Sequence, residues 1–548
     1  MKSSLAKVCL KLVLMAMFIV PGLGSTEDSA ITSDFTSALD KLATASMQER
    51  EAAVQHLALT KGPRTVVVLQ ALLDGHLYKI REGEKLVVAK PQGDSLSLND
   101  AESGDDLGVK EPAELQKITL NNSLRVLLRK TLGRLQLNSS DTTTRIEAIK
   151  AMAKVPDEES LTLLHDRMAV EQETAVQDKI KIVFAFEQLD RTTKSDRIAA
   201  IELLKTHPTQ DVVNRLNALV EKDADGNYLE TDNDVRNKAK TALVAINSKI
   251  SFYGGIETLF FGLSLGAVLV LSAIGLAITF GVMGVINMAH GELMMLGAYA
   301  TYVLQQLMPQ HLGAALLLSI PTAFVVSALV GIAIERGIIR FLYGRPLETL
   351  LATFGVSLVL QQTVRSIFSP LNRSVSAPEW MSGTWQVNDF LSLTWNRFYI
   401  LIFCLLVFIL LLQILKRTRL GLEVRAVAQN RNMAKAMGIP TAWVDAMTFG
   451  LGSGIAGVAG VALSQITNVG PNLGQAYIVD SFMVVVFGGV GNIWGTLLAG
   501  FSLGIANKLL EPTAGAVLAK ILVLVFIILF IQKRPRGLFP QKGRAAEG

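Results

Sequence analysis

Long apolar segments separated by short polar gaps fill the chain from about Glu257 onward. A helix needs about 20 apolar residues to cross the hydrocarbon core of a bilayer, and most of these segments approach that length. We expect membrane spans at 258–280, 286–307, 313–335, 347–368, 398–415, 442–466, 477–490, 493–509 and 516–532. The seventh and eighth segments are short and have glycines between them, so they form one broken helix or a re-entrant pair. The expected count is therefore eight or nine spans.

Lysine and arginine cluster in every second gap between these segments. The clusters are Arg336, Arg340 and Arg345; Lys416, Arg417, Arg419, Arg425, Arg431 and Lys435; and, in the tail, Lys533, Arg534, Arg536, Lys542 and Arg544. The intervening gaps hold little beyond Arg373 and Arg397. Because cytoplasmic loops of membrane proteins are enriched in basic residues, this alternation places the clusters, and with them the tail at 541–548, in the cytoplasm. A tail on the basic side favours an odd number of spans.

The first 25 residues predict a secretory signal peptide. Three lysines precede an apolar run at 12–20, and Pro21 and small residues follow it. The alternative is a first transmembrane helix, but the run is shorter than the roughly 20 residues that a span needs. The two cysteines, Cys9 and Cys404, allow no disulfide framework, so the exported region folds on its apolar core alone.

Residues 26–250 are polar and charged and carry a recurring helical pattern. Thr144–Ala151, Asp196–Leu204 and Asp234–Ile246 share a pattern of the type Arg-Ile-x-Ala-Ile, and Gln48–Leu59 is a weaker match. Apolar residues recur in them at three- and four-residue spacing, as one buried helix face requires. Their separation of roughly 40 to 50 residues suits a helical-repeat solenoid of HEAT type. The chain is thus expected to be mainly α, with an exported repeat domain at 26–250 and a membrane domain at 251–540.

Two segments of the exported region depart from this pattern. His76–Ile80 and Lys85–Lys90 are short β-like runs that predict a small hairpin, and we expect a loop at 93–108. Asp223–Asp234 carries oxygen ligands at a spacing similar to a calcium loop, but Tyr228 stands where the sharp turn of an EF-hand needs glycine. A solvated turn is therefore preferred to a calcium site.

Bulk composition excludes several classes of protein. At 548 residues with 50% apolar content, the chain is too long and too apolar for one soluble domain. Its net charge of +5 indicates no nucleic-acid partner, because topology accounts for the basic loops. The sequence contains no P-loop, no H-E-x-x-H, no paired C-x-x-C and no G-x-S-x-G. We therefore expect no enzyme, and no metal or cofactor bound by this chain.

The basic gap at 416–439 is the strongest functional element that the residues alone indicate. Leu422, Ala426, Met433 and Met437 share one side of a predicted helix. Gly438 then supplies a C-terminal cap, and Pro440 prevents continuation. Such a helix has a methionine-bearing face that suits a groove on a soluble partner. The alternative is an amphipathic helix lying on anionic lipid.

Polar side chains within the apolar segments are candidates for a translocation pathway, because they are costly in a bilayer. They are Asn287, His290, Glu292, Thr353, Gln361, Gln362, Gln465, Asn468, Asn472, Asp480 and Asn492. Amides and hydroxyls outnumber charges, which favours a small, polar, neutral solute over an ion. The alternative for Asn287, His290 and Glu292 is that they cap or cross-link helix ends.

Glycines recur every third to fifth position in two apolar stretches. They are Gly450, Gly454, Gly457 and Gly460 in one, and Gly491, Gly495, Gly500 and Gly504 in the other. Small residues at such spacing let helix backbones approach closely, so we expect packing within the subunit. A dimer interface and a glycine-lined pathway are the alternatives.

Four motifs resemble the branched-chain amino acid ABC permease family. Phe280–Leu296 is similar to its Asn-x-Ala-His-Gly-Glu signature, and 416–439 to its ATPase-coupling segment. Phe487–Gly495 resembles its glycine-rich third block, and 534–539 its C-terminal signature. Within the family, Asn468–Gly474 and the long helical domain before the first span most resemble the permease of urea-type ABC transporters.

This resemblance implies a permease subunit in a bacterial inner membrane that imports urea or a short amide. Its implied partners are a second permease subunit, two cytoplasmic ABC ATPases that use ATP, a periplasmic solute-binding protein and the lipid bilayer. The implied coupling helix contains Gly421, Leu422, Arg425, Ala426, Asn430, Ala434, Met437 and Gly438. The alternatives are a branched-chain amino acid permease with an unusual appendage, a membrane-anchored sensor and a passive urea channel.

Overall fold

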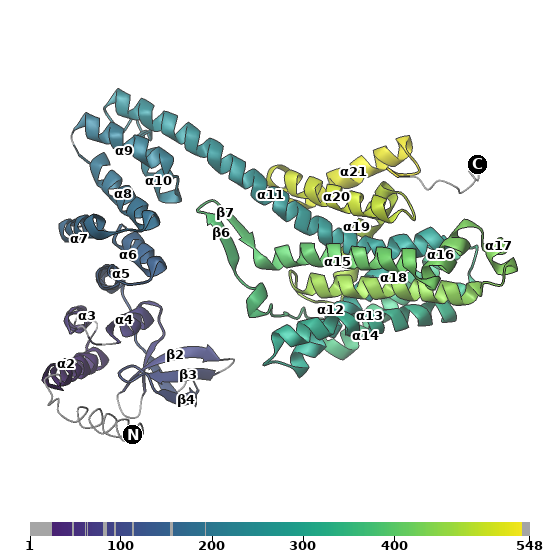
Figure 1. Ribbon diagram of the computed structural model, residues 1–548, viewed down its shortest axis with the longest axis horizontal. Helices are drawn as coiled ribbons and strands as arrows, with labels where there is room; N and C mark the ends of the chain where they lie inside the picture. The colour runs from purple at the N-terminus through teal and green to yellow at the C-terminus, as the bar shows by residue number, and fades with distance from the viewer. Residues whose placement is uncertain are drawn as a thin grey trace, which may run out of the picture. The chain divides into compact units, whose positions relative to one another are not determined.

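The computed structural model describes residues 25–46, 49–60, 62, 64–80, 85–92, 95–111, 114–153, 157–191 and 193–539. These residues divide into two compact units, with the boundary between Val244 and Ala245 (Figure 1). Residues 1–24, which hold nearly all of the predicted signal peptide, and the predicted tail at 541–548 lie outside the described residues.

The first unit is mainly helical. Its helices are α2 (Ser25–Thr44), α3 (Arg50–Leu59), α4 (Thr65–Leu73), α5 (Asn122–Gln136), α6 (Thr142–Ala153), α7 (Glu158–Val170), α8 (Thr174–Leu189), α9 (Lys194–Thr206) and α10 (Gln210–Ala218). The patterned stretches lie in α3, α6, α9 and the long helix α11 (Asn233–Met283), which confirms their helical character. Helix α5 illustrates how apolar spacing sets the buried face of a helix. Its residues Leu124, Leu128 and Leu132 are four apart, so they share one face, which is buried in the unit's largest core cluster.

Arg145 and Arg197 are each the fourth residue of their helix, α6 and α9, and make matching contacts. Arg145 donates from Nε and Nη2 to the Glu171 carboxylate, at 3.0 and 3.1 Å. Arg197 contacts the Glu230 carboxylate with both terminal nitrogens, one of them at 3.1 Å. Each arginine also donates to a backbone carbonyl that precedes its own helix. These shared contacts agree with an internal repeat, while assignment to the HEAT class stays a prediction.

A five-stranded antiparallel sheet interrupts the helices of this unit. Its strands are β1 (Leu77–Ile80), β2 (Leu86–Gln92), β3 (Ser95–Asp100), β4 (Asp106–Lys110) and β5 (Leu115–Lys117), in the order β4-β3-β2-β1-β5. The predicted hairpin is confirmed, since Leu77 pairs with Val88. The predicted loop at 93–108 is wrong, because most of that segment forms β3 and β4. Its polar residues lie on an antiparallel sheet that tolerates a solvated face.

The second unit is a helical assembly. Its elements are α11 (Asn233–Met283, which begins in the first unit), α12 (His290–Leu307), α13 (Leu312–Gly337), η2 (Ile339–Phe341), α14 (Pro346–Phe368), η3 (Glu379–Met381), β6 (Thr384–Asn388), β7 (Leu391–Thr394), α15 (Trp395–Arg417), α16 (Arg419–Gln429), α17 (Arg431–Ala436), α18 (Thr441–Ser464), α19 (Leu473–Gly488), α20 (Ile493–Ala514) and α21 (Ala516–Lys533). Helix α11 continues through Gly254 and Gly255, where we expected the exported domain to end.

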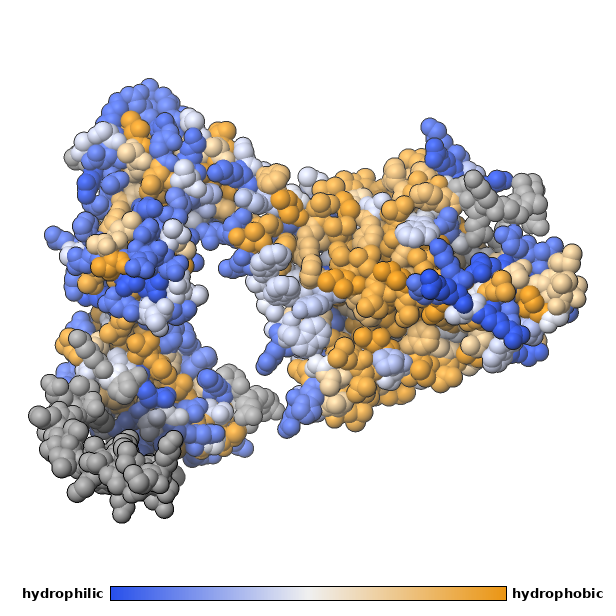
Figure 2. All heavy atoms as spheres, in the orientation of Figure 1, coloured by the Kyte–Doolittle hydropathy of each residue, from blue (hydrophilic) through white to orange (hydrophobic). Residues whose placement is uncertain are grey.

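Each of the nine predicted spans contains a helix, and seven of the described helices are long and apolar enough to cross a membrane. Figure 2 shows the apolar surface that these helices present. The remaining two predicted spans contain α12 and α19. Helix α12 has 18 residues that include His290, Glu292 and two glutamines, and α19 has only 16 residues. The count of eight or nine spans therefore stays a prediction.

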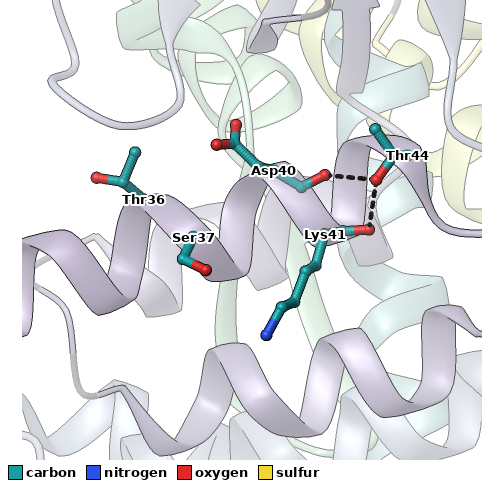
Figure 3. Close-up of a pocket in the computed structure, with 5 residues that line it drawn as sticks. All are labelled: Thr36, Ser37, Asp40, Lys41 and Thr44. Atoms are coloured by element: carbon teal, nitrogen blue, oxygen red, sulfur yellow. Dashed lines mark hydrogen bonds between the residues drawn. The ribbon is translucent and has the colours of Figure 1, made fainter.

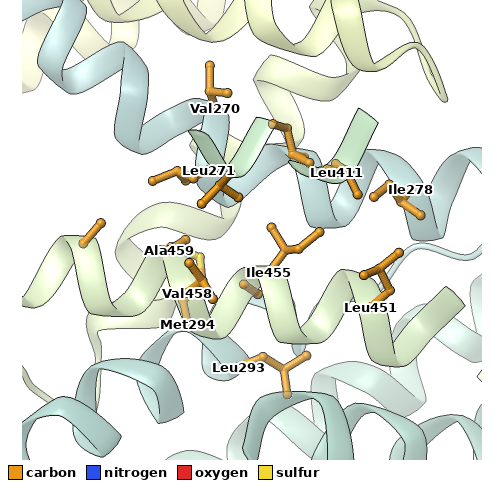
Figure 4. Close-up of a cluster of buried hydrophobic side chains, with 14 of the residues drawn as sticks. Val270, Leu271, Ile278, Leu293, Met294, Leu411, Leu451, Ile455, Val458 and Ala459 are labelled. Carbon is orange, nitrogen blue, oxygen red and sulfur yellow. The ribbon is translucent and has the colours of Figure 1, made fainter. Parts of the chain in front are cut away.

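Glycine lets the helices of the second unit pack backbone to backbone. A Cβ on Gly297 would lie 2.0 Å from the Gly457 carbonyl oxygen, and one on Gly460 would lie 1.9 Å from that of Met294. The predicted packing role within the subunit is confirmed at these contacts, which join α12 to α18. Large apolar side chains fill the remaining space (Figure 4): Val270, Leu271, Ile278, Leu293, Met294, Leu411, Leu451, Ile455, Val458 and Ala459.

Candidate functional site

The connection between α11 and α12 is a non-helical stretch of backbone within the apolar unit. Gly284 has a φ of +66°, a conformation that favours glycine, and the helix resumes only at His290. Thr353 of α14 holds this connection by accepting a hydrogen bond from the Met288 backbone N–H at 3.1 Å. Irregular backbone at membrane depth is tolerated where protein or a water-filled cavity surrounds it, which makes broken helices pointers to transport sites.

Glu292, in the first turn of α12, is the centre of a buried polar cluster. Its side chain is 1% exposed. Oε1 accepts hydrogen bonds from Ser357 Oγ at 3.0 Å and from Gln361 Nε2 at 2.7 Å, both on α14. Ser357 and Gln361 are four residues apart and so share one face of that helix. The structure thus brings together two predicted residues, Glu292 and Gln361, and adds Ser357. The four-residue spacing was the signal that sequence reasoning overlooked.

Three buried polar atoms near this point have no protein partner: Asn287 Nδ2, His290 Nδ1 and Glu292 Oε2. The other hydrogen-bonding atom of each group is satisfied. Asn287 Oδ1 accepts from the Ala289 N–H at 3.0 Å, and His290 Nε2 lies 2.8 Å from the Ser272 carbonyl oxygen. Buried polar groups without partners are rare and call for an explanation such as a ligand. We define Glu292, Ser357 and Gln361, which share hydrogen bonds, as the buried cluster.

The remaining predicted pathway residues do not join the buried cluster. Gln362, Asn468 and Asn472 are exposed. Asp480 pairs with Lys520 of α21 at 3.2 Å, and Gln465 carries a buried oxygen without a partner beside α15. Asn492 caps α20 by accepting from the Gly495 N–H at 3.0 Å.

The exposed residue Asn472 accepts a hydrogen bond from an arginine on α14, the helix that carries Ser357 and Gln361. Arg365 Nη2 donates to Asn472 Oδ1 at 2.7 Å, and Arg365 lies four residues after Gln361 on α14. A guanidinium group therefore lies one helical turn beyond the Gln361 amide.

The segment 416–439, which we call the coupling segment, consists of two short helices, α16 and α17. The predicted single helix is wrong, because Asn430 has extended backbone and caps α17 by accepting from the Met433 N–H at 2.9 Å. The capping side chain competes with helix continuation at this position. Gly438, with a φ of +85°, ends the segment as expected.

The predicted residues of the coupling segment fall into exposed and buried groups. Leu422, Met433 and Met437 are exposed by 61%, 61% and 77%. Gly421 and Ala434 are buried, and a Cβ on Gly421 would lie 2.2 Å from the Leu415 carbonyl oxygen. The Arg425 guanidinium donates to that same carbonyl, and Ala426 is half-buried. The segment thus presents apolar side chains outward while its small residues contact the spans.

A second polar network joins the coupling segment to the spans, and sequence reasoning did not single it out. Arg431 of α17 binds both carboxylate oxygens of Asp445 in α18, one at 3.0 Å. Its guanidinium lies 3.9 Å from the centre of the Tyr343 ring. Burial, with the nearby Asp445 carboxylate, raises the pKa of Tyr343, so the phenol stays protonated and donates to Asp445 Oδ1 at 3.4 Å. The signal available was an aspartate inside an apolar span.

Two features of the first unit carry no site. A hollow along α2 is lined by Thr36, Ser37, Asp40, Lys41 and Thr44 (Figure 3). It is open, and Thr44 bonds the backbone of its own helix. The candidate calcium loop forms a turn in which Asp223 Oδ1 accepts from the Asn227 N–H at 2.8 Å. Within the described part of the chain, no three His, Cys, Asp and Glu side chains are grouped to hold a metal ion.

Comparison with known proteins covers the second unit. The family model described as branched-chain amino acid transport system / permease component matches residues 258–531, half of the chain. The high-affinity branched-chain amino acid transport system permease protein LivH of Escherichia coli is 31% identical over 293 residues, which cover 52% of this chain and 94% of that protein. The corresponding protein BraD of Pseudomonas aeruginosa is 28% identical over 296 residues, covering 52% and 96%.

A more distant similarity extends to archaea. The probable branched-chain amino acid transport permease protein LivH of Methanocaldococcus jannaschii is 27% identical over 289 residues, covering 49% of this chain and 88% of that protein. No solved structure matches the chain significantly. The family match begins at residue 258, so the first unit lies outside it.

Proposed function

Because this chain belongs to the branched-chain amino acid transport permease family, we propose that it is a membrane subunit of an ATP-driven amino acid importer. The chain is a transport permease and not an enzyme, and ATP hydrolysis belongs to separate subunits. The proposed solute is a branched-chain amino acid, which is the substrate named for the relatives. A urea permease, expected from the sequence motifs, becomes the second candidate.

The buried cluster carries this proposal. An amino acid has an ammonium group and a carboxylate group, so its pathway needs groups of both charges. Glu292 presents a buried oxygen, Oε2, without a protein partner. Arg365 lies on α14, beyond Gln361, where Asn472 holds its guanidinium. We assign Glu292 to the ammonium group and Arg365 to the carboxylate group of the passing solute.

The second candidate rests on the chemistry that surrounds Glu292. Ser357 and Gln361, the two side chains that bond its carboxylate, are neutral. A neutral solute with several N–H donors, such as urea, also satisfies Oε2. Urea has no carboxylate group to pair with Arg365, however, so mutation of the site can distinguish the two solutes.

Energy input is assigned to the coupling segment. Its exposed side chains Leu422, Met433 and Met437 form an adaptable apolar surface of the kind that docks into a groove on another protein. We infer that two cytoplasmic ATPases bind here, that a second permease subunit completes the pathway, and that a periplasmic binding protein delivers the solute. The basic gaps orient the coupling segment and the C-terminal end towards the cytoplasm of a bacterial inner membrane.

The test of the assignment is the substitution Glu292→Gln, with Glu348→Gln as the matched control. Glu348 also lies on a membrane helix, but its side chain is 54% exposed and pairs with Arg345 on the surface. We expect Glu292→Gln to raise the KM for leucine at least tenfold, because a neutral amide lacks the negative charge that pairs with an ammonium group. Glu348→Gln is expected to leave it unchanged. Equal KM values for the two variants would contradict the assignment, and loss of urea uptake in Glu292→Gln with leucine uptake unchanged would favour the second candidate.

A further inference from the structure

A single arginine joins the second half of the coupling segment to two membrane helices. Arg431 is the first residue of α17, immediately after the break at Asn430. Asp445, its carboxylate partner, lies in the second turn of α18 and has a side chain that is 2% exposed. Tyr343 follows η2, the short helix at the end of α13. The contacts of Arg431 thus reach the cytoplasmic ends of both α13 and α18.

The chemistry of this contact requires arginine rather than any cation. The guanidinium contacts both oxygens of Asp445 while its central carbon, Cζ, lies over the Tyr343 ring, 3.9 Å from the ring centre. A planar, delocalised cation satisfies a carboxylate at two points and stacks on an aromatic ring at the same time, whereas lysine offers one point charge. A carboxylate as buried as Asp445 also needs a paired cation, since an unpaired buried charge is strongly destabilising.

The first half of the coupling segment is attached separately. Gly421 contacts the backbone of Leu415 at the end of α15, and Arg425 donates to the Leu415 carbonyl. Both short helices lie close to α18, but their other attachments differ: α16 is held at the end of α15, and α17 is held through Arg431 at Tyr343, beyond the end of α13. Of the three apolar side chains that point outward, Met433 and Met437 lie in or directly after α17, and Leu422 lies on α16. A bound partner that moves Met433 and Met437 therefore moves α17, the helix that Arg431 holds.

We propose that Arg431 is a positioning residue that couples ATP hydrolysis to solute movement. It transmits displacement of α17 to α13 and α18 through Asp445 and Tyr343. This inference rests on the proposed function, because it assumes that ATPases bind the coupling segment. It adds to that function the route by which their motion reaches the spans. Helix α18 packs against α12 through Gly460 and Gly457, so the route leads to the helix that carries Glu292.

The test measures the number of ATP molecules hydrolysed per leucine transported, in proteoliposomes that contain the complete transporter purified through a tag on this chain. The double variant Arg431→Gln/Asp445→Asn removes both charges and leaves no unpaired buried ion. Arg431→Lys keeps the charge and loses the two-point contact. Arg345→Gln is the control, because Arg345 has a side chain that is 65% exposed and pairs with Glu348 on the surface.

We expect the double variant to hydrolyse ATP within twofold of the parent while uptake falls at least tenfold, so that the ratio rises at least fivefold. Arg431→Lys raises the ratio several-fold, and it carries the test if the double variant fails to assemble. An unchanged ratio in an assembled variant overturns the proposal, as does a parallel loss of hydrolysis and uptake, which indicates a structural role alone. If the parent itself shows no ATP-dependent leucine uptake, the proposed function fails and this inference fails with it.

Discussion

The substitution Glu171→Gln is expected to destabilise the first unit strongly. The Glu171 side chain is 2% exposed and receives both Arg145 and Arg167. Its carboxylate accepts from Arg145 Nε at 3.0 Å, from Arg167 Nη2 at 2.8 Å and from the Glu173 backbone N–H at 3.1 Å. Glutamine has the same shape but carries no charge, and one end of its amide is a donor that faces the guanidinium groups.

The size of the expected loss of stability follows from the burial of Arg145, the cation that remains when Glu171 is replaced. Arg145 is only 7% exposed, so the substitution leaves a buried guanidinium without its counter-ion. Breaking a buried ion pair from one side costs about 3–5 kcal/mol. At about 1.4 kcal/mol for each factor of ten, the population of the locally opened state rises about 100- to 4,000-fold.

Hydrogen exchange of amides in α6 and α8, measured on the full chain in detergent, reports this opening directly. Glu187→Gln is the matched control, because Glu187 lies on α8 and also accepts two donors from one arginine, Arg191. That pair is on the surface, with side chains 34% and 51% exposed, and such pairs contribute about 0–1 kcal/mol. Similar exchange rates in the two variants would refute the reasoning.

The same carboxylate predicts a pH dependence. Burial alone would raise the pKa of Glu171, but hydrogen bonds from Arg167, the Glu173 N–H and Arg145 outweigh it and lower the pKa to about 2. A group with a lowered folded pKa stabilises the fold above its unfolded value, here 4.5, and loses that contribution as the pH falls through its folded pKa. The advantage of the parent over Glu171→Gln should therefore shrink between about pH 4.5 and pH 2.

Two further predictions concern the second unit. Gly297→Val should prevent accumulation of folded protein in membranes, because a Cβ at this position meets the Gly457 carbonyl oxygen at 2.0 Å. The control Gly355→Ala should accumulate normally, because its Cβ meets nothing within 4 Å. Equal yields of the two variants would contradict the packing argument. Met437→Glu should abolish co-purification of the ATPases, because it places a charge on the exposed apolar surface of the coupling segment. The control Leu371→Glu changes a residue that is 68% exposed in the predicted outer loop, and this variant should retain the ATPases. Retention of the ATPases in both variants would reject the docking surface.

Periodicity and charge predicted the helices well, because both follow from local chemistry. The nine apolar segments all contain helices, and Gly457 and Gly460, two of the glycines whose spacing predicted close packing, lie against the backbones of Gly297 and Met294. The break at Asn430 could also have been expected, since an asparagine amide competes for backbone N–H groups. It was missed because the apolar spacing continues across it.

Tertiary contacts were beyond the reach of the sequence. Glu292 and Gln361 were both selected as polar residues in spans, but only the fold pairs them, and it places Asp480 against Lys520 instead. Arg431 was read as one of several basic loop residues, because nothing in its own segment reveals that Asp445 and Tyr343 converge on it. The strands β3 and β4 were missed for a related reason, since their polar sequence gains stability only from the neighbouring strands.

The measurement that tests the central claim most directly is uptake of radiolabelled leucine and urea by cells with and without this chain, before and after ATP depletion. The account predicts that leucine uptake falls at least tenfold when the chain is removed, and that ATP depletion produces the same loss. Urea uptake should not change. Loss of urea uptake alone would transfer the proposal to the second candidate. Leucine uptake that is independent of both the chain and ATP, with urea uptake also unchanged, would contradict the account.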